Sequence, residues 1–365
     1  MAISAKDVQK LREMTGVGMM DCKKALTEAD GDFDKAIEWL REKGLAAQTK
    51  KAGKIAAEGV SYAITADNGV GVVIEVNSQT DFVAKNEVFQ GFVKDLATIV
   101  ANENPADVEA LKACTYPGTD RTVADVTADK VLAIGENIQV RRFVRYAEGV
   151  NVPYIHMGGK IGVLVNLEVE GIEADKVTEL GKDIAMQIAA MNPAYLDKSD
   201  VDQTTLDKEK EILLIQAKED PKNANKPENI IEKMVMGRIG KYYEENCLLQ
   251  QAFVKENKVS VEKHIAEVAK QLGGKIAVKA FTRFQTGEGI EKAEEDFAAG
   301  SLKELFRDTI RLNTSASSLE SFASTQKNPF LTNWKLSYTV YEKQYAQSSR
   351  TNLWLLIAYK RKFFG

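Results

Sequence analysis

Apolar residues in the first part of the chain recur at helical spacing in three short runs. Ser4 is typical of the residue that caps the first run, and Asp32 of the residue that caps the third. The second run covers residues 19–29, and Gly44 predicts the end of the third helix. The pattern therefore predicts a domain of three helices at residues 1–55.

A short sequence repeat marks the next part of the chain. The string AEGV begins at residue 57 and again at residue 147, and an alternating run, a glycine turn and a second apolar run follow each copy. This order is typical of a β-hairpin. A helical stretch comes after each hairpin, at residues 82–101 and 175–190. We therefore expect two related α+β core subdomains, at residues 56–143 and 144–284.

Residues 205–245 become strongly helical, in two amphipathic runs joined by a polar loop. They predict an antiparallel helical hairpin, a coiled-coil excursion from the second subdomain, whose role could be structural or partner contact. A strand at residues 275–284 closes that subdomain. Residues 285–299 are expected to form a C-terminal helical module. Residues 300–365 differ in composition, so they are treated as a tail without an assigned function.

A polar corner, formed by Thr80, Asp81 and Phe82, follows an apolar strand and opens a helix. Neighbouring residues cannot share one face of a helix, so if Asp81 or Phe82 caps or packs, the other points elsewhere. Taken alone, Phe82 is typical of a core residue and Asp81 of a helix cap. The second copy of the repeat lacks this corner, which indicates a role in function rather than in folding.

Composition limits the possible functions further. The chain has 365 residues, 28% charged and 44% hydrophobic, with a net charge of −4. This charge gives no reason to expect direct binding of nucleic acid. No apolar run approaches the ~20 residues that a membrane span needs, and no signal peptide is recognised. A cytoplasmic protein is therefore the expectation.

Sites for catalysis, metals or cofactors are not indicated. None of the Gly-Lys pairs in the chain is followed by serine or threonine, and those at residues 53, 159 and 274 are followed by isoleucine, so no phosphate-binding loop is predicted. The three cysteines and two histidines are far apart in the sequence, without the spacing of metal ligands. By elimination, a protein-binding or regulatory role is favoured over an enzyme.

Three further residues are candidates for partner contact. Met19 and Met20 are about 100° apart around a helix, so at most one can lie at the centre of a three-helix core. The other could be an adaptable contact at the rim, although both could also fill the core. His156 lies beside a glycine turn, where it could be a polar contact or a plain hairpin-packing residue.

Two long motifs resemble the elongation factor Ts family, the bacterial exchange factors for the GTPase elongation factor Tu. The first is TGVGMMDCKKAL at residues 15–26, and the second is EVNSQTDFVAK at residues 75–85. Shorter strings at residues 134–137, 161–164 and 287–292 follow in family order. The resemblance covers residues 1 to about 299 and leaves the tail unmatched. It implies a ubiquitin-associated-like N-terminal domain, two core subdomains, a coiled-coil hairpin and a C-terminal module.

The resemblance also implies a mechanism. Phe82 would insert near the nucleotide and Mg²⁺ site of elongation factor Tu and promote GDP release, and Thr80 and Val83 beside it would also bind the partner. Asp81 would hold the partner's adjacent helix or backbone. Met19 and Met20 would contact the G domain, and His156 would lie on a second contact surface. No cofactor, metal or nucleotide would bind the factor itself.

Two questions stay open at this point. The chain could act as a homodimer or in a two-to-two complex with the GTPase. An alternative function is a non-catalytic adaptor that binds proteins through its N-terminal helical module, without nucleotide exchange.

Overall fold

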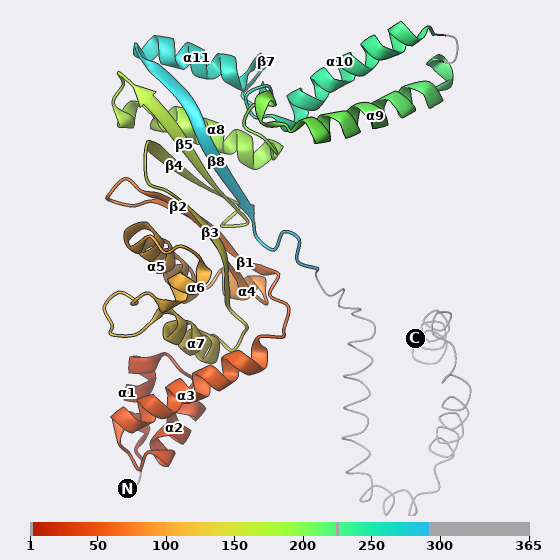
Figure 1. The fold of residues 1–365 in the computed structure, drawn as a ribbon. Coiled ribbons are helices and arrows are strands. Elements are labelled where there is room, and N and C mark those ends of the chain that lie inside the picture. The colour runs from red at the N-terminus through yellow and green to blue at the C-terminus, as the bar shows by residue number, and fades with distance from the viewer. Residues whose placement is uncertain (1–2, 224–225, 292–365) are drawn as a thin grey trace, which may run out of the picture. The chain divides into compact units, whose positions relative to one another are not determined.

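The structure is a computed structural model that describes residues 3–223 and 226–291, all within one compact unit, Met1–Lys292. These residues form an α+β fold, in which N-terminal helices precede antiparallel sheets and the helices that cover them (Figure 1). The expected tail at 300–365 lies outside the described residues. Residues 292–299 of the expected C-terminal module lie outside them as well.

Three helices open the chain, as predicted: α1 (Ala5–Thr15), α2 (Met19–Glu28) and α3 (Phe33–Lys51). Helix α1 begins at a capping box, in which the side chains of Ser4 and Asp7 each accept a hydrogen bond from the other's backbone N–H. Asp32 caps α3 by accepting from two backbone N–H groups. The helices pack around a small core that includes Leu11, Leu26 and Leu40.

The prediction that Gly44 ends the third helix is wrong, because α3 continues beyond it to Lys51. Gly44 is buried where α3 packs against α7 (Val123–Ile134). A Cβ atom added at Gly44 would lie only 3.2 Å from the carbonyl oxygen of Ala128. The glycine therefore permits a close helix contact, and the sequence alone cannot distinguish this role from that of a helix stop.

The first antiparallel sheet contains β1 (Glu58–Thr65), β2 (Gly71–Ser78) and β3 (Gln139–Tyr146), with β2 in the middle. Helices α5 (Glu87–Glu103), α6 (Val108–Ala113) and α7 cover one face (Figure 1). Alternate residues of β2 point toward these helices and pack against α5, since side chains alternate between the faces of a strand. The core at this face includes Val72, Ile74, Val76, Phe89, Phe92 and Leu96.

The single helix predicted at residues 82–101 is divided into two in the structure. Helix α4 covers only Asp81–Ala84, and α5 begins after Asn86. The Asn86 side chain accepts hydrogen bonds from the backbone N–H groups of Val88 and Phe89, which starts the new helix. Phe82 therefore lies in a helix of four residues, shortly after the end of β2.

The second antiparallel sheet has the same strand order as the first. It contains β4 (Val150–His156), β5 (Ile161–Glu170) and β8 (Lys275–Gln285), with β5 in the middle. Helices α8 (Thr178–Met191) and α11 (Val261–Leu272) pack on one face. The remaining short elements are β6 (Ala252–Phe253), β7 (Glu256–Ser260) and the 3-10 helices η1 (Ala174–Val177), η2 (Lys198–Asp200) and η3 (Pro221–Asn223).

The two sheets pack against each other through the faces that no helix covers. Ala63 and Val73 of the first sheet meet Leu164 and Phe284 of the second in a small buried cluster. The Tyr146 hydroxyl hydrogen-bonds to the Thr282 hydroxyl at 2.8 Å across the same junction. Both faces of each sheet are therefore covered, which explains why all eight residues of β2 are buried.

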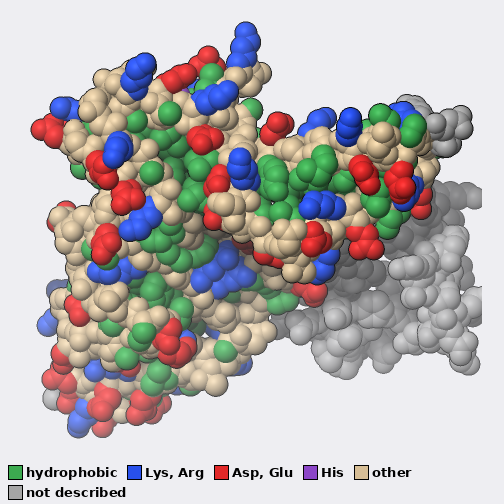
Figure 2. All heavy atoms as spheres, turned by 45° about the horizontal axis from the view of Figure 1, so that its top comes forward, with side chains coloured by type: hydrophobic (Ala, Val, Ile, Leu, Met, Phe, Trp, Pro, Cys, Tyr) green, Lys and Arg blue, Asp and Glu red, His purple; other side chains and the backbone are tan. Residues whose placement is uncertain are grey.

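Helices α9 (Gln203–Glu219) and α10 (Glu228–Asn246) form an antiparallel pair, as predicted for residues 205–245. Ile231 and Val235 of α10 pack against Ala217 of α9. On the face seen in Figure 2, hydrophobic side chains of this pair are mixed with acidic and basic ones. Among the helices of the described residues, none has the length and apolar composition needed to cross a membrane.

Candidate functional site

The corner presents the Phe82 ring to solvent. Thr80 caps α4, so Asp81 and Phe82 are the first two residues of the helix, and the third and fourth, Val83 and Ala84, are buried. Because these two residues anchor one side of the short helix in the core, Phe82 is directed to the other side. Its side chain is 80% exposed. The alternative in which Phe82 is a core residue does not hold.

The loop after α7 binds the chain just before Phe82. One carboxylate oxygen of Glu136 accepts hydrogen bonds from the backbone N–H groups of Gln79 (3.1 Å) and Thr80 (3.0 Å). The other accepts from the Thr80 hydroxyl at 2.7 Å. The backbone N–H of Asn137 donates to the side-chain oxygen of Gln79 at 3.0 Å. Four hydrogen bonds therefore connect this loop to the corner and to Gln79.

Asp81 lies at the surface of the corner, beside Lys85. Its carboxylate accepts a hydrogen bond from the Lys85 ammonium group at 2.6 Å, one turn along the chain. This hydrogen bond lowers the pKa of Asp81, and the charge of Lys160 contributes in a minor way. Asp81 is therefore ionised at neutral pH, and it can accept hydrogen bonds from a partner if Lys85 moves aside. Thr80, not Asp81, is the helix cap.

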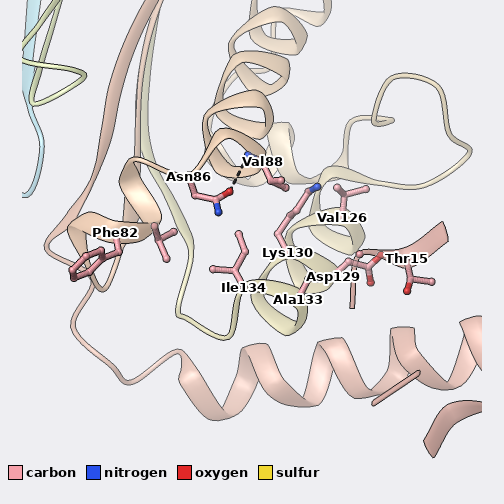
Figure 3. Close-up of a pocket in the computed structure, with 11 residues that line it drawn as sticks. Thr15, Phe82, Asn86, Val88, Val126, Asp129, Lys130, Ala133 and Ile134 are labelled. Atoms are coloured by element: carbon pink, nitrogen blue, oxygen red, sulfur yellow. Dashed lines mark hydrogen bonds between the residues drawn. The ribbon is translucent and has the colours of Figure 1, made fainter. Parts of the chain in front are cut away.

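A groove of about 520 Å³ lies between the N-terminal helices, the corner and α7. In Figure 3 the Phe82 ring lies at one end of this groove and Thr15 at the other, with Lys130 and Ile134 of α7 between them. The groove brings together residues of the two long sequence motifs, at 15–26 and 75–85. Its lining consists of Thr15, Gly16, Phe82, Val83, Asn86, Val88, Val126, Asp129, Lys130, Ala133 and Ile134.

Met19 and Met20 begin α2, directly after the glycine turn that borders the groove. Met20 is 76% exposed and Met19 is 39% exposed. Neither side chain belongs to the buried core of the three helices, so the alternative in which both fill the core does not hold. The N-terminal helices therefore present two flexible apolar side chains at their surface.

His156 lies apart from the groove, at the end of β4 in the second sheet. Its Nδ1 atom is 3.0 Å from the Tyr154 hydroxyl, and the two rings are tilted at 31°. The turn that follows contacts the first sheet, because the carbonyl of Gly159 accepts a hydrogen bond from the Ser61 N–H at 2.7 Å. The exposed Met157 in this turn adds an apolar side chain next to His156.

The comparison with known families decides to which family the chain belongs. The family model described as elongation factor TS matches residues 79–288, more than half of the chain. The chain belongs to the elongation factor Ts family. This assignment confirms the resemblance carried by the two long motifs.

Curated relatives in the elongation factor Ts family match over nearly their whole length. Elongation factor Ts of Syntrophotalea carbinolica is 48% identical over 301 residues, 82% of this chain and 98% of that protein. The protein of Clostridium perfringens strain SM101 is 52% identical over 299 residues, with coverages of 81% and 97%. That of Clostridium botulinum strain Eklund 17B is 50% identical over 306 residues, with coverages of 83% and 99%.

Elongation factor Ts is a translation elongation factor and a nucleotide exchange factor, not a catalytic enzyme, which confirms the prediction made by elimination. The family implies the GTPase elongation factor Tu as the partner. The exposed ring, the ionised carboxylate and the two methionines are suited to contact with a protein.

Sequence reasoning gave no role to Glu136, although it noted the string at residues 134–137. In this member of the elongation factor Ts family, Glu136 makes three of the four hydrogen bonds between its loop and the segment of Gln79 and Thr80. The only signal in the sequence was a carboxylate directly after a glycine that ends a helix. That signal does not reveal which distant backbone groups the carboxylate meets.

Proposed function

We propose that the chain promotes GDP release from elongation factor Tu by inserting Phe82 near the nucleotide and Mg²⁺ site. By linkage, a factor that binds the nucleotide-free GTPase more tightly must weaken nucleotide binding by the same factor. The observation that carries the proposal is the exposure of Phe82 on a short helix anchored in the core. An exposed aromatic ring on an anchored helix is suited to insertion into a partner, because buried aromatic residues carry much of the binding energy of protein interfaces.

We infer supporting roles for the other candidate residues. Asp81 would accept hydrogen bonds from a helix or backbone of the partner, after exchanging its contact with Lys85. Met19 and Met20 would contact the G domain across the groove, and His156 would lie on the second contact surface. Thr80 and Val83 would support Phe82 more than contact the partner. The Thr80 hydroxyl already bonds to Glu136, and Val83 is 8% exposed.

The test is the release of fluorescent GDP from elongation factor Tu, measured by stopped flow with Phe82→Ala. We expect release to slow by about tenfold or more, as is usual for an aromatic residue at the centre of an interface. Val254→Ala is the matched control, because it also truncates an exposed apolar side chain, in the turn between β6 and β7. An unchanged release rate with folded Phe82→Ala would remove Phe82 from the mechanism.

The second candidate function is an adaptor that docks through the N-terminal helices, and the exposure of Met19 and Met20 is the observation that favours it. An adaptor without exchange activity would bind nucleotide-loaded and empty elongation factor Tu equally. An exchange factor must prefer the empty form. A pull-down with and without excess GDP therefore separates the two functions.

We also propose the finer organisation of the fold. The two sheets, with their common strand order, would be copies of one subdomain, covering residues 56–143 and 144–284. Strand β3 extends to Tyr146, which moves the boundary between the copies by a few residues. The helices of residues 1–55 would form a ubiquitin-associated-like domain. A homodimer, or a two-to-two complex with the GTPase, stays a prediction, which a mass measurement in solution can test.

A further inference from the structure

Glu136 makes an unusual set of contacts for a loop carboxylate. It accepts three hydrogen bonds, all from Gln79 and Thr80, which lie more than fifty residues earlier in the sequence. Two of the donors are backbone N–H groups that precede α4. The carboxylate therefore satisfies the groups that a strand leaves unpaired where it turns into a helix.

The third contact reaches the helix that carries Phe82. The Thr80 hydroxyl donates to Glu136 at 2.7 Å and accepts from the Val83 N–H at 3.5 Å, so one hydroxyl connects the carboxylate to the first turn of α4. A helix of four residues has little stability of its own, because nucleation is costly. The direction of the Phe82 ring consequently depends on the contacts at the start of α4 and on the two buried residues that follow Phe82.

Glu136 is itself held in place. Gly135 ends α7 in the left-handed conformation, with φ of 84°, and its N–H donates to the Val131 carbonyl. On the other side, the Asn137 side chain donates to the Lys54 carbonyl at 2.7 Å. The carboxylate therefore projects from a fixed helix end. Helix α7 also packs against α3 of the N-terminal helices, which fixes its position further.

We propose that Glu136 is a positioning residue for nucleotide exchange, which fixes the direction of Phe82 through Thr80. This inference rests on the proposed function of Phe82. Glu136 acts before the partner arrives, because its acceptors are already occupied by Gln79 and Thr80. Without the Glu136 carboxylate the Phe82 ring is still present, but α4 can take several orientations, and only some of them direct the ring into the partner.

The test is Glu136→Gln, which keeps the size of the side chain but replaces one acceptor oxygen by an NH₂ group. This group is itself a donor, so it cannot accept the hydrogen bonds from Gln79 and Thr80. We expect GDP release from elongation factor Tu to slow by about tenfold at limiting factor concentration, in line with the loss of hydrogen bonds to a charged group. Thr80→Val, which removes the connecting hydroxyl, is expected to slow release similarly. Thr80→Ser, which keeps the hydroxyl, is expected to restore most of the rate.

Asp125→Asn is the matched control for stability. The Asp125 carboxylate accepts from the backbone N–H and the hydroxyl of Thr122, in a capping box at the opposite end of the same helix α7. Its loss weakens α7 without touching the corner. We expect Asp125→Asn to lower the midpoint of urea unfolding as much as Glu136→Gln does, and to leave GDP release unchanged.

A double-mutant cycle with Phe82→Ala distinguishes positioning from a general loss of folded protein. If Glu136 acts through the ring, Glu136→Gln slows release in the wild-type background and has no further effect in the Phe82→Ala background. Equal effects in both backgrounds would overturn the proposal, as would undiminished release by Glu136→Gln. If Phe82→Ala alone leaves release unchanged, the proposed function of Phe82 is wrong, whatever the effect of Glu136→Gln.

Discussion

At the scale of single residues, two phenylalanines of one segment have opposite environments. Phe82 is 80% exposed, whereas Phe89, seven residues later in α5, is fully buried against the first sheet. We expect Phe82→Ala to change the free energy of unfolding by less than about 0.5 kcal/mol, as surface substitutions usually do. Phe89→Ala should cost about 3–5 kcal/mol, because it leaves a cavity in the core. Urea unfolding followed by circular dichroism measures both.

A large loss of stability in Phe82→Ala would mean that the ring packs inside the protein, and it would contradict the exposed position on which the proposed function depends. Comparison with Phe89→Ala is informative because the same atoms are removed from the same region of the chain. The pair therefore reports on burial alone.

The sequence predicted the helix start at the corner, but it could not predict which side chain would face solvent. That outcome depends on which residue caps the helix. With Thr80 as the cap, Val83 and Ala84 reach the core and Phe82 does not. The decisive contact comes from Glu136, which is distant in the sequence. Likewise, the spacing of Met19 and Met20 excluded burial of both at the core centre, and the structure exposes both to different degrees.

At the scale of elements, the contact between α3 and α7 depends on the absence of a side chain at Gly44. We expect Gly44→Leu to destabilise the protein by about 1–3 kcal/mol, because the added atoms must displace the backbone of α7 near Ala128. Gly91→Ala is the matched control, since Gly91 lies within α5 with no atom within 4 Å of an added Cβ. It should stabilise the protein by up to about 1 kcal/mol through helix propensity.

Thermal unfolding of both glycine variants tests this reading. Similar stabilisation by both substitutions would show that the two helices tolerate a larger separation, and the close contact at Gly44 would then be unimportant.

The helix ends that the sequence predicted wrongly have a common cause. Apolar periodicity predicted where helices exist, but their ends depended on contacts that the pattern does not show. Helix α3 continues past Gly44, and the stretch predicted as one helix ends before Asn86, which caps α5.

At the scale of the whole described fold, one buried carboxylate connects the two sheets. Glu75 of β2 is fully buried, and its oxygens accept from Arg141 (2.9 Å), Arg142 (2.6 Å) and the Gly287 N–H after β8 (2.8 Å). A register shift beside Glu75 places two consecutive residues of β3 opposite one residue of β2, which lets both arginines reach the same carboxylate. Arg142 also lies over the ring of Phe284 in β8, 4.2 Å from its centre.

The second sheet has a register shift at the corresponding position, beside Asn166 of its middle strand. There a neutral amide replaces the carboxylate and donates to Asn151 at 2.8 Å. The sequence indicated the repeat but gave no sign that Glu75 would be buried among arginines. An acidic residue in an apolar strand is ordinarily taken as solvent-exposed, and its partners lie on strands that only the folded chain brings together.

This connection makes stability depend on pH in a defined direction. Burial by itself raises the pKa of Glu75, but the hydrogen bonds from Gly287, Arg141, Arg142 and Asn77 outweigh it, so that the pKa lies below the ordinary glutamate value of 4.5. A carboxylate with a lowered folded-state pKa stabilises the fold above its unfolded-state pKa, and this contribution is lost as the pH falls through the folded-state value. The connection should therefore be intact at neutral pH and weaken in acid, below about pH 4.5.

Glu75→Gln tests this dependence, because it removes the buried charge that faces both arginines and leaves Arg142 only its pair with Glu288. We expect a loss of about 3–5 kcal/mol at pH 7, typical of breaking a buried ion pair from one side. The difference from wild type should shrink as the pH is lowered from 5 toward 3, since the wild-type carboxylate then becomes neutral as well. Glu170→Gln is the control: Glu170 pairs with Lys275 at an exposed strand end, so its removal should alter stability little. A constant difference between Glu75→Gln and wild type across this pH range would mean that the charge of Glu75 does not connect the sheets, and that packing between them suffices.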